Sequence, residues 1–107
     1  MATRSLSLGQ FTGSSLQEAR RILADDWEGH PPPVSFRTPV IVRLTAEGRF
    51  AVMDGYHRLA AALALGRKSL RGVVATEEEI RDHRGAGEEG EAAWIARVLR
   101  RARRRSA

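Results

Sequence analysis

Two short apolar runs that lead directly into a helical segment constrain the fold more than any other feature of this chain. The first run, residues 39–44 (PVIVRL), is rich in β-branched side chains, and the second, residues 50–53 (FAVM), follows a short polar segment. Gly48 lies in that segment and supplies the positive φ that a tight turn requires. The pattern predicts an antiparallel hairpin that turns at Glu47 and Gly48.

A helix is predicted immediately after this hairpin. Asp54 follows the second strand, and its side-chain oxygen can accept hydrogen bonds from the first turn of a helix. Apolar residues then recur at helical spacing, and Gly66 suits the position just past a helix end. We therefore expect a central helix capped by Asp54 and reaching about Gly66, with its apolar face formed by Tyr56, Leu59, Ala60 and Leu63.

Further elements flank this unit on both sides. Ser14 or Ser15 can cap a helix that runs to about Asp26, with Glu18 completing a capping box. A connection rich in proline, residues 27–33 (WEGHPPP), ends that helix because three prolines cannot continue it. Residues 69–75 read as a third strand, and a second capping-box pattern at residues 76–79 (TEEE) opens a short helix.

The chain divides into four segments by composition. Residues 1–13 show no periodicity and are predicted to form an arm, residues 14–84 the folded domain, and residues 85–90 a glycine-rich joint. Residues 91–107 form a basic amphipathic helix whose apolar stripe includes Trp94, Val98 and Ala102. The order of elements predicts an α+β fold, close to α/β, with a small mixed sheet.

The basic character of the chain is confined to this last segment. The net charge is +5, but six arginines follow residue 96, and removing them leaves 12 Lys and Arg against 13 Asp and Glu. Contact with nucleic-acid phosphates is therefore an expectation for the tail and not for the body. The arginines concerned are Arg97, Arg100, Arg101, Arg103, Arg104 and Arg105.

Composition also excludes several classes of function. A chain of 107 residues without cysteine has room for one domain and lacks disulfides, thiolate-bound zinc and thiol catalysis. No apolar run approaches the roughly 20 residues of a membrane span, so we expect no membrane partner and a cytoplasmic location.

Residues 54–58 (DGYHR) carry the pattern with most chemical content. A strand that delivers the chain into a helix start presents free N–H groups and the positive end of the helix dipole to an anion. His57 and Arg58 add donors in the first turn, and Arg58 can grip a phosphate with two parallel hydrogen bonds. Asp54 can cap the helix, orient His57 or ligate a metal held by phosphates. The alternative is ordinary cap and turn chemistry with a solvated His-Arg pair.

The run from Thr38 to about Ala75, which contains this motif, resembles the core of the ParB/sulfiredoxin superfamily, also known as ParB-like nuclease domains. The resemblance rests on the hairpin, the Asp-Gly-x-His-Arg motif with its Leu-x-Ala-Ala continuation, the closing glycine and the strand that follows, and it covers roughly residues 15–80. It implies that the helix-opening motif binds nucleotide phosphates.

Differences from known members narrow the implied activity. Sulfiredoxins carry Gly-Cys-His-Arg, and here Tyr56 takes the place of the cysteine, so the resemblance does not extend to sulfiredoxin chemistry. Partition proteins bind CTP with Gly-Glu-Arg-Arg, which Gly55 and Arg58 match and Tyr56 and His57 do not. Other members are ATP- or ADP-dependent kinases of small molecules, nucleases or ATPases, and these are compatible with Asp54, Gly55 and Arg58.

The leading expectation is therefore a nucleotide-binding domain that uses ATP or CTP with Mg²⁺. Gly55, Tyr56, His57 and Arg58 would bind phosphate, while His57 and Asp54 are the candidate catalytic residues and Asp54 the indirect metal ligand. Phosphoryl transfer to a small molecule or nucleotide hydrolysis is the matching reaction class.

Two alternatives stay open beside it. The first is a DNA- or RNA-associated module, without catalysis or nuclease-like, that uses the C-terminal arginines. The second is a small adaptor that forms a homodimer through its last helix.

Overall fold

The predicted α+β fold with a small mixed sheet is confirmed. The computed structural model describes residues 3–106, apart from the side chains of residues 88, 89, 105 and 106. In chain order the elements are β1 (Thr3–Ser7), η1 (Leu8–Gln10), α1 (Gly13–Trp27), β2 (Val40–Leu44), β3 (Phe50–Asp54), α2 (Tyr56–Ala64), β4 (Ser69–Val74) and α3 (Glu77–Ser106).

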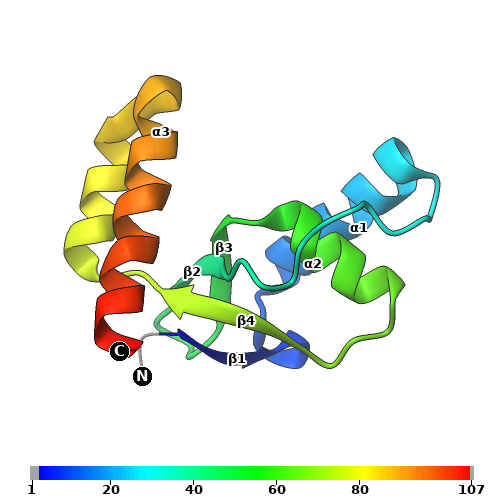
Figure 1. The fold of residues 1–107 in the computed structure, drawn as a ribbon. Coiled ribbons are helices and arrows are strands. Elements are labelled where there is room, and N and C mark those ends of the chain that lie inside the picture. Colours follow the sequence, from blue (N-terminus) through cyan, green and yellow to red (C-terminus); the bar gives the residue numbers. More distant parts are fainter. Residues whose placement is uncertain (1–2, 107) are drawn as a thin grey trace.

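The molecule has three layers, with the sheet in the middle (Figure 1). The strand order is β1-β4-β2-β3, in which β2 and β4 run parallel and the two outer pairs run antiparallel. The helices α1 and α2 lie on one side of the sheet, and α3 covers the other side (Figure 1). A sheet covered on both faces needs strands that are apolar on both sides, and residues 40–42 of β2 are all buried.

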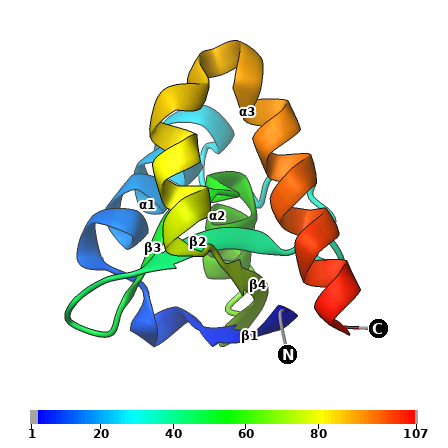
Figure 2. The ribbon, with the colours of Figure 1, turned by 90° about the vertical axis from the view of Figure 1, so that its left-hand side faces the viewer.

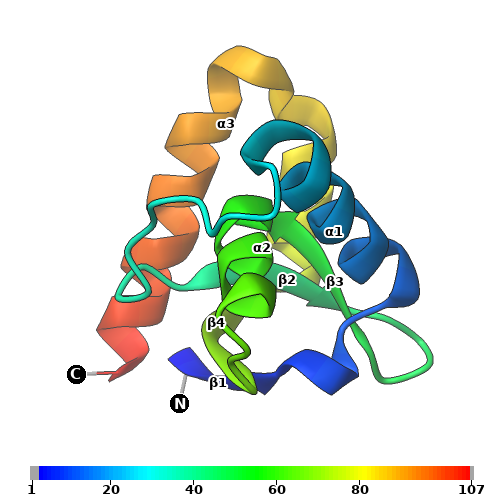
Figure 3. The same ribbon diagram turned by 90° about the vertical axis from the view of Figure 1, so that its right-hand side faces the viewer.

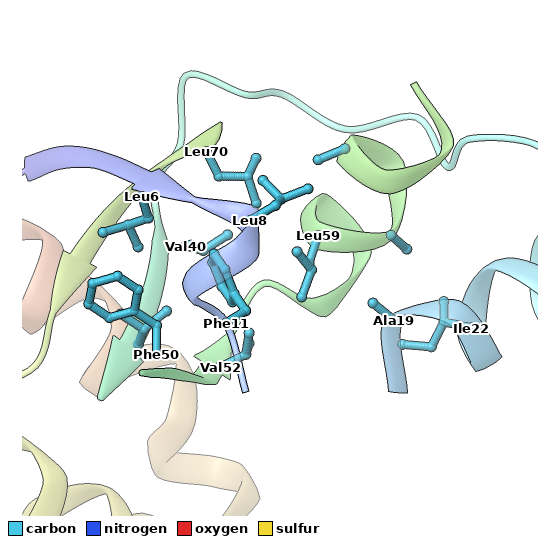
Figure 4. Close-up of a cluster of buried hydrophobic side chains, with 13 residues drawn as sticks. Leu6, Leu8, Phe11, Ala19, Ile22, Val40, Phe50, Val52, Leu59 and Leu70 are labelled. Carbon is cyan, nitrogen blue, oxygen red and sulfur yellow. The ribbon is translucent and has the colours of Figure 1, made fainter. Parts of the chain in front are cut away.

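The larger core lies between the sheet and the first two helices (Figure 4). Because successive side chains of a strand point to opposite faces, Val40 and Val42 enter this core while Ile41 enters the other. Leu59 of α2 and Ala19 of α1 are fully buried against them. The small side chains of residues 60–62 let α2 approach the sheet and α1 closely.

The second core lies under α3, which is a helical hairpin and not one straight helix (Figure 2). Gly87, with φ 64° and ψ −176°, breaks the helix within the predicted joint at residues 85–90. The second arm places Trp94, Val98 and Ala102 on the sheet, as its apolar stripe predicts. The indole N–H of Trp94 donates to the backbone oxygen of Glu79 at 2.8 Å and ties the two arms together.

The N-terminal segment differs from the prediction of an arm over residues 1–13. From Thr3 onward it forms the edge strand β1, which pairs antiparallel with β4. Leu6, Leu8 and Phe11 are buried in the larger core. The sequence pattern does not predict this strand, because its alternation is short and its exposed residues are serine and arginine, which are not typical of strands.

The start of α1 also differs from the prediction. Thr12, and not Ser14 or Ser15, is the N-cap, and its hydroxyl accepts a hydrogen bond from Ser15 N at 3.1 Å. The Ser15 hydroxyl is buried and accepts from Val52 N at 3.0 Å, which satisfies a backbone donor of the edge strand β3. Glu18 pairs with Arg21 and takes no part in a capping box.

Three further local predictions are confirmed. The hairpin of β2 and β3 turns at residues 45–49, where Gly48 has φ 78°. The predicted strand at residues 69–75 is β4, and the capping box at the start of α3 is complete. Thr76 N donates to Glu79 Oε1 at 2.9 Å, and Glu79 N donates to the Thr76 hydroxyl at 3.1 Å.

We predict that Leu6→Ala lowers the free energy of unfolding by about 2–4 kcal/mol, because it opens a cavity beneath β1. Leu44→Ala is the matched control: Leu44 is 52% exposed, whereas Leu6 is 1% exposed, so the control should change stability by less than about 0.5 kcal/mol. Urea denaturation of both variants measures the difference. If the two variants lost equally little stability, the N-terminal segment would be a loose arm and not a strand of the sheet.

Candidate functional site

The junction between β3 and α2 is the centre of the candidate site. Gly55 links the two elements with φ 113° and ψ 27°, a left-handed conformation that side chains disfavour. A Cβ atom there would lie 2.7 Å from Val40 Cγ1 and 3.0 Å from Arg58 Nη1. Glycine is therefore required by packing of the protein on itself, in addition to any approach by a ligand.

Asp54 is not the N-cap of α2, contrary to the prediction. The N-cap is Gly55, without a side-chain cap hydrogen bond, because the helix begins one residue later than expected. The helix ends close to the predicted place: Ala64 is its last residue, and Gly66 follows with φ 67°. Arg67 N donates to Ala62 O at 2.9 Å, as in a Schellman motif.

The first turn of α2 carries the N–H groups expected to attract an anion. Arg58 N and Leu59 N both donate to Gly55 O, at 3.0 and 3.1 Å. The N–H groups of Tyr56 and His57 come earlier and have no helical carbonyl to pair with. They sit at the positive end of the helix dipole, where negative charge is stabilised.

The guanidinium of Arg58 lies folded back across this helix start. Its Nη1 atom is 3.4 Å from the backbone oxygen of Pro39 and 3.8 Å from Asp54 Oδ2. Within the part of the chain that the structure describes, its other N–H groups have no partner. The side chain is therefore held in place by weak contacts at one nitrogen and keeps donors for another acceptor.

Asp54 is half-buried between α2 and α3. Burial raises the pKa of its carboxyl above the usual value, and the nearby Arg58 opposes that rise. Two residues of α3 act on it as well: Glu91 raises the pKa further and His83 lowers it. His83 and Glu91 are themselves 3.6 Å apart. Nothing in the sequence indicated this connection, because the two residues lie far along the chain on separate arms of α3.

The junction between β3 and α2 forms part of the lining of a cavity of about 350 Å³. One wall is residues 54–58, and the other is the segment before β2, which contributes Pro33, Val34, Ser35 and Thr38. The hydroxyls of Ser35 and Thr38 were not predicted as site residues, and the only sequence signal for this wall was the proline run that stiffens it.

The predicted phosphate-binding residues are brought together, but with different exposures. Tyr56 packs partly against the larger core, as its helical spacing indicated, while His57 is exposed at the cavity. In the described part of the chain, His, Asp and Glu side chains nowhere gather in threes as a metal site would require. Among the residues that line this cavity, Asp54 is the one carboxylate.

The C-terminal arginines do not form one free basic face. Arg97 pairs with Asp82 at 2.6 Å, and Arg101 pairs with Glu79 at 2.5 Å and donates to Val74 O at 3.3 Å. Burial works against ionisation of Glu79, but hydrogen bonds from Arg101 and Thr76 outweigh it and hold the pKa of that carboxyl below its usual value.

Two of the six predicted nucleic-acid contacts thus hold the hairpin of α3 together, with the apolar stripe of that helix packed on the sheet. Arg100, Arg103 and Arg104 are exposed, and the side chain of Arg105 lies outside the described residues. Replacing the whole run would therefore disturb the fold as well as the charge, since it would remove Arg101. No helix in the described part of the chain is both long and apolar enough for a membrane span.

Comparison with known proteins gives a likeness in structure alone. No protein-family model matches the chain, and no curated protein matches its sequence. The chain is structurally similar to sulfiredoxin. The crystal structure of sulfiredoxin from Arabidopsis thaliana matches with a TM-score of 0.40 and 19% identity, covering 76% of this chain and 94% of that one. A likeness at this level carries no information on activity, so the function rests on the site itself.

We predict that Gly55→Ala destabilises the protein more than Gly48→Ala does. Both glycines have positive φ, so each alanine costs about 1 kcal/mol in backbone strain. Nothing lies within 4 Å of a Cβ at Gly48, whereas at Gly55 it collides with Val40, which adds about 1–3 kcal/mol. Urea denaturation measures both losses, and equal losses would contradict the tight packing of β2 on the helix start.

Proposed function

We propose that the chain binds a nucleotide through its phosphate groups in the cavity between residues 33–38 and 54–58. The observation that carries this proposal is the position of Arg58, whose guanidinium lies over a helix start with donors unused. Phosphate oxygens accept several hydrogen bonds at once, and a helix start beside an arginine offers donors and positive charge together. The hydroxyls of Ser35 and Thr38 add two more donors on the opposite wall.

Each residue of the motif has a distinct part in this proposal. The N–H groups of Tyr56 and His57 receive one phosphate, and Arg58 exchanges its weak contact with Pro39 O for a charge-assisted pair. The imidazole of His57, exposed at the rim, contacts the next phosphate. Tyr56 packs against the core, so its ring is not assigned to stacking on the base.

The size of the cavity limits what enters it. At about 350 Å³ it lies near the lower end of small-molecule sites, which supports entry of the phosphates with the ribose and base across the rim. Asp54 is the one carboxylate of the lining, and a Mg²⁺ ion held by the phosphates would find its single protein ligand there.

The same groups suit phosphoryl transfer to a small molecule or nucleotide hydrolysis. In such reactions the protein contributes positioning and electrostatic stabilisation and needs no covalent nucleophile. We assign His57 the role of general acid at the leaving phosphate, and Asp54 that of holding His57 or the metal. Thiol chemistry of the sulfiredoxin kind is not available, since the chain has no cysteine.

We predict that Arg58→Ala weakens nucleotide binding by tenfold to a hundredfold, because it removes a charge-assisted contact worth about 1.5–3 kcal/mol. Arg58→Lys should recover only part of the loss, since an ammonium cannot replace a two-pronged pair. Thermal-shift screening with ATP, ADP and CTP, with and without Mg²⁺, selects the nucleotide, and calorimetric titration then compares the variants.

Arg43→Ala is the matched control, because Arg43 is an exposed arginine of β2 outside the cavity. This variant should bind the nucleotide with the affinity of the wild type. Melting curves without ligand separate any loss of fold from a loss of binding, which matters because Arg58 also contacts Pro39. The proposal fails if no nucleotide raises the melting temperature, or if Arg58→Ala retains full affinity.

A further inference from the structure

A second cavity adjoins the Thr38–Pro39 segment and shares only Thr38 with the lining of the first. It measures about 310 Å³, and three arginines from separate parts of the chain line it: Arg37, Arg71 and Arg103. Arg37 belongs to the segment before β2, Arg71 to β4 and Arg103 to the second arm of α3. Figure 3 shows this segment passing close to the C-terminal part of α3. The rest of the lining is Thr3, Thr38, Pro39, Leu99 and Ala102.

Among the residues that the structure describes, no acidic side chain pairs with the arginines of this cavity. The lining includes no Asp or Glu, and among the described residues none of the three arginines has a carboxylate within ion-pair distance. A cavity between the two arms of α3 differs in this respect, because its lining combines four arginines with Glu78, Glu79 and Asp82. Like charges gathered without a counter-charge repel one another, and an anion removes that repulsion.

The fold fixes the backbone positions of two of the three arginines, whose side chains are exposed. Arg71 lies two residues before Val73 on the same face of β4, and Val73 is buried under α3. Arg103 directly follows Ala102, which is buried in the same core. Because the strand and the docked helix fix the backbone at these two positions, binding a ligand there requires ordering of side chains and not of backbone.

We propose that this cavity binds a small organic anion with phosphate or carboxylate groups on a short aliphatic frame. The arginines match the anionic groups, while Pro39, Leu99 and Ala102 offer apolar surface to the frame. No aromatic side chain lines the cavity, so a nucleic acid would find no surface on which its bases could stack. The site stands independently of the proposed nucleotide site, although Thr38 lines both cavities.

Calorimetric titration of the full chain with 3-phosphoglycerate tests this proposal, because that probe carries a phosphate and a carboxylate on three carbons. The double variant Arg71→Gln/Arg103→Gln should lose at least about tenfold in affinity. The double variant Arg100→Gln/Arg104→Gln removes the same charge from exposed positions outside the cavity and should bind within about twofold of the wild type. Melting curves of both variants verify that the fold is kept.

Four results would overturn the proposal, and the last of them concerns Arg58. The first is the absence of measurable binding to the wild type at millimolar concentrations of the probe. The second is an equal loss in the two double variants, which would mean a diffuse effect of charge. The third is tighter binding of a single-stranded oligonucleotide with the same variant dependence, which would make the patch a nucleic-acid contact. The variant Arg58→Ala should still bind 3-phosphoglycerate. Loss of that binding in Arg58→Ala would instead place the probe in the first cavity.

Discussion

The close contact between Gly55 and Val40 is the constraint on which the rest of the site depends. Val40 is fully buried at the start of β2, and only a residue without Cβ fits beside it at the end of β3. That glycine turns the chain from strand to helix, and the same missing side chain leaves room for Arg58 to fold back over the helix start. The packing of the core and the placement of the groups that could bind a ligand therefore both depend on the absence of a side chain at Gly55.

The segment before β2 connects this junction to the rest of the molecule. Its prolines stiffen it, Pro39 O accepts a hydrogen bond from Arg58, and Thr38 lies between two cavities that differ in character. The first cavity combines a helix start with one half-buried carboxylate, Asp54, while the lining of the second has three arginines and no carboxylate. The two proposed sites would therefore hold their ligands as neighbours, with Thr38 in the lining of both.

Local patterns in the sequence predicted the hairpin, α2 and the capping box of α3, because turns, caps and helical periodicity depend on residues a few positions apart. Contacts between distant segments were missed for the same reason. Nothing near Leu6 indicates that β4 is its partner, and nothing near Arg101 indicates that Glu79 holds it. The motif located the site, but its second wall and the influence of α3 on Asp54 exist only in the folded chain.

The most direct test of this account is a titration of the ¹⁵N-labelled protein with ATP, followed by the backbone amide resonances. Binding at the helix start should shift the amides of Tyr56, His57 and Arg58 most and saturate them together, while those of the hairpin turn at residues 45–49 stay unchanged. Shifts confined to the arms of α3, or none at residues 55–58 at saturating ATP, would show that this helix start is ordinary surface and would contradict the account.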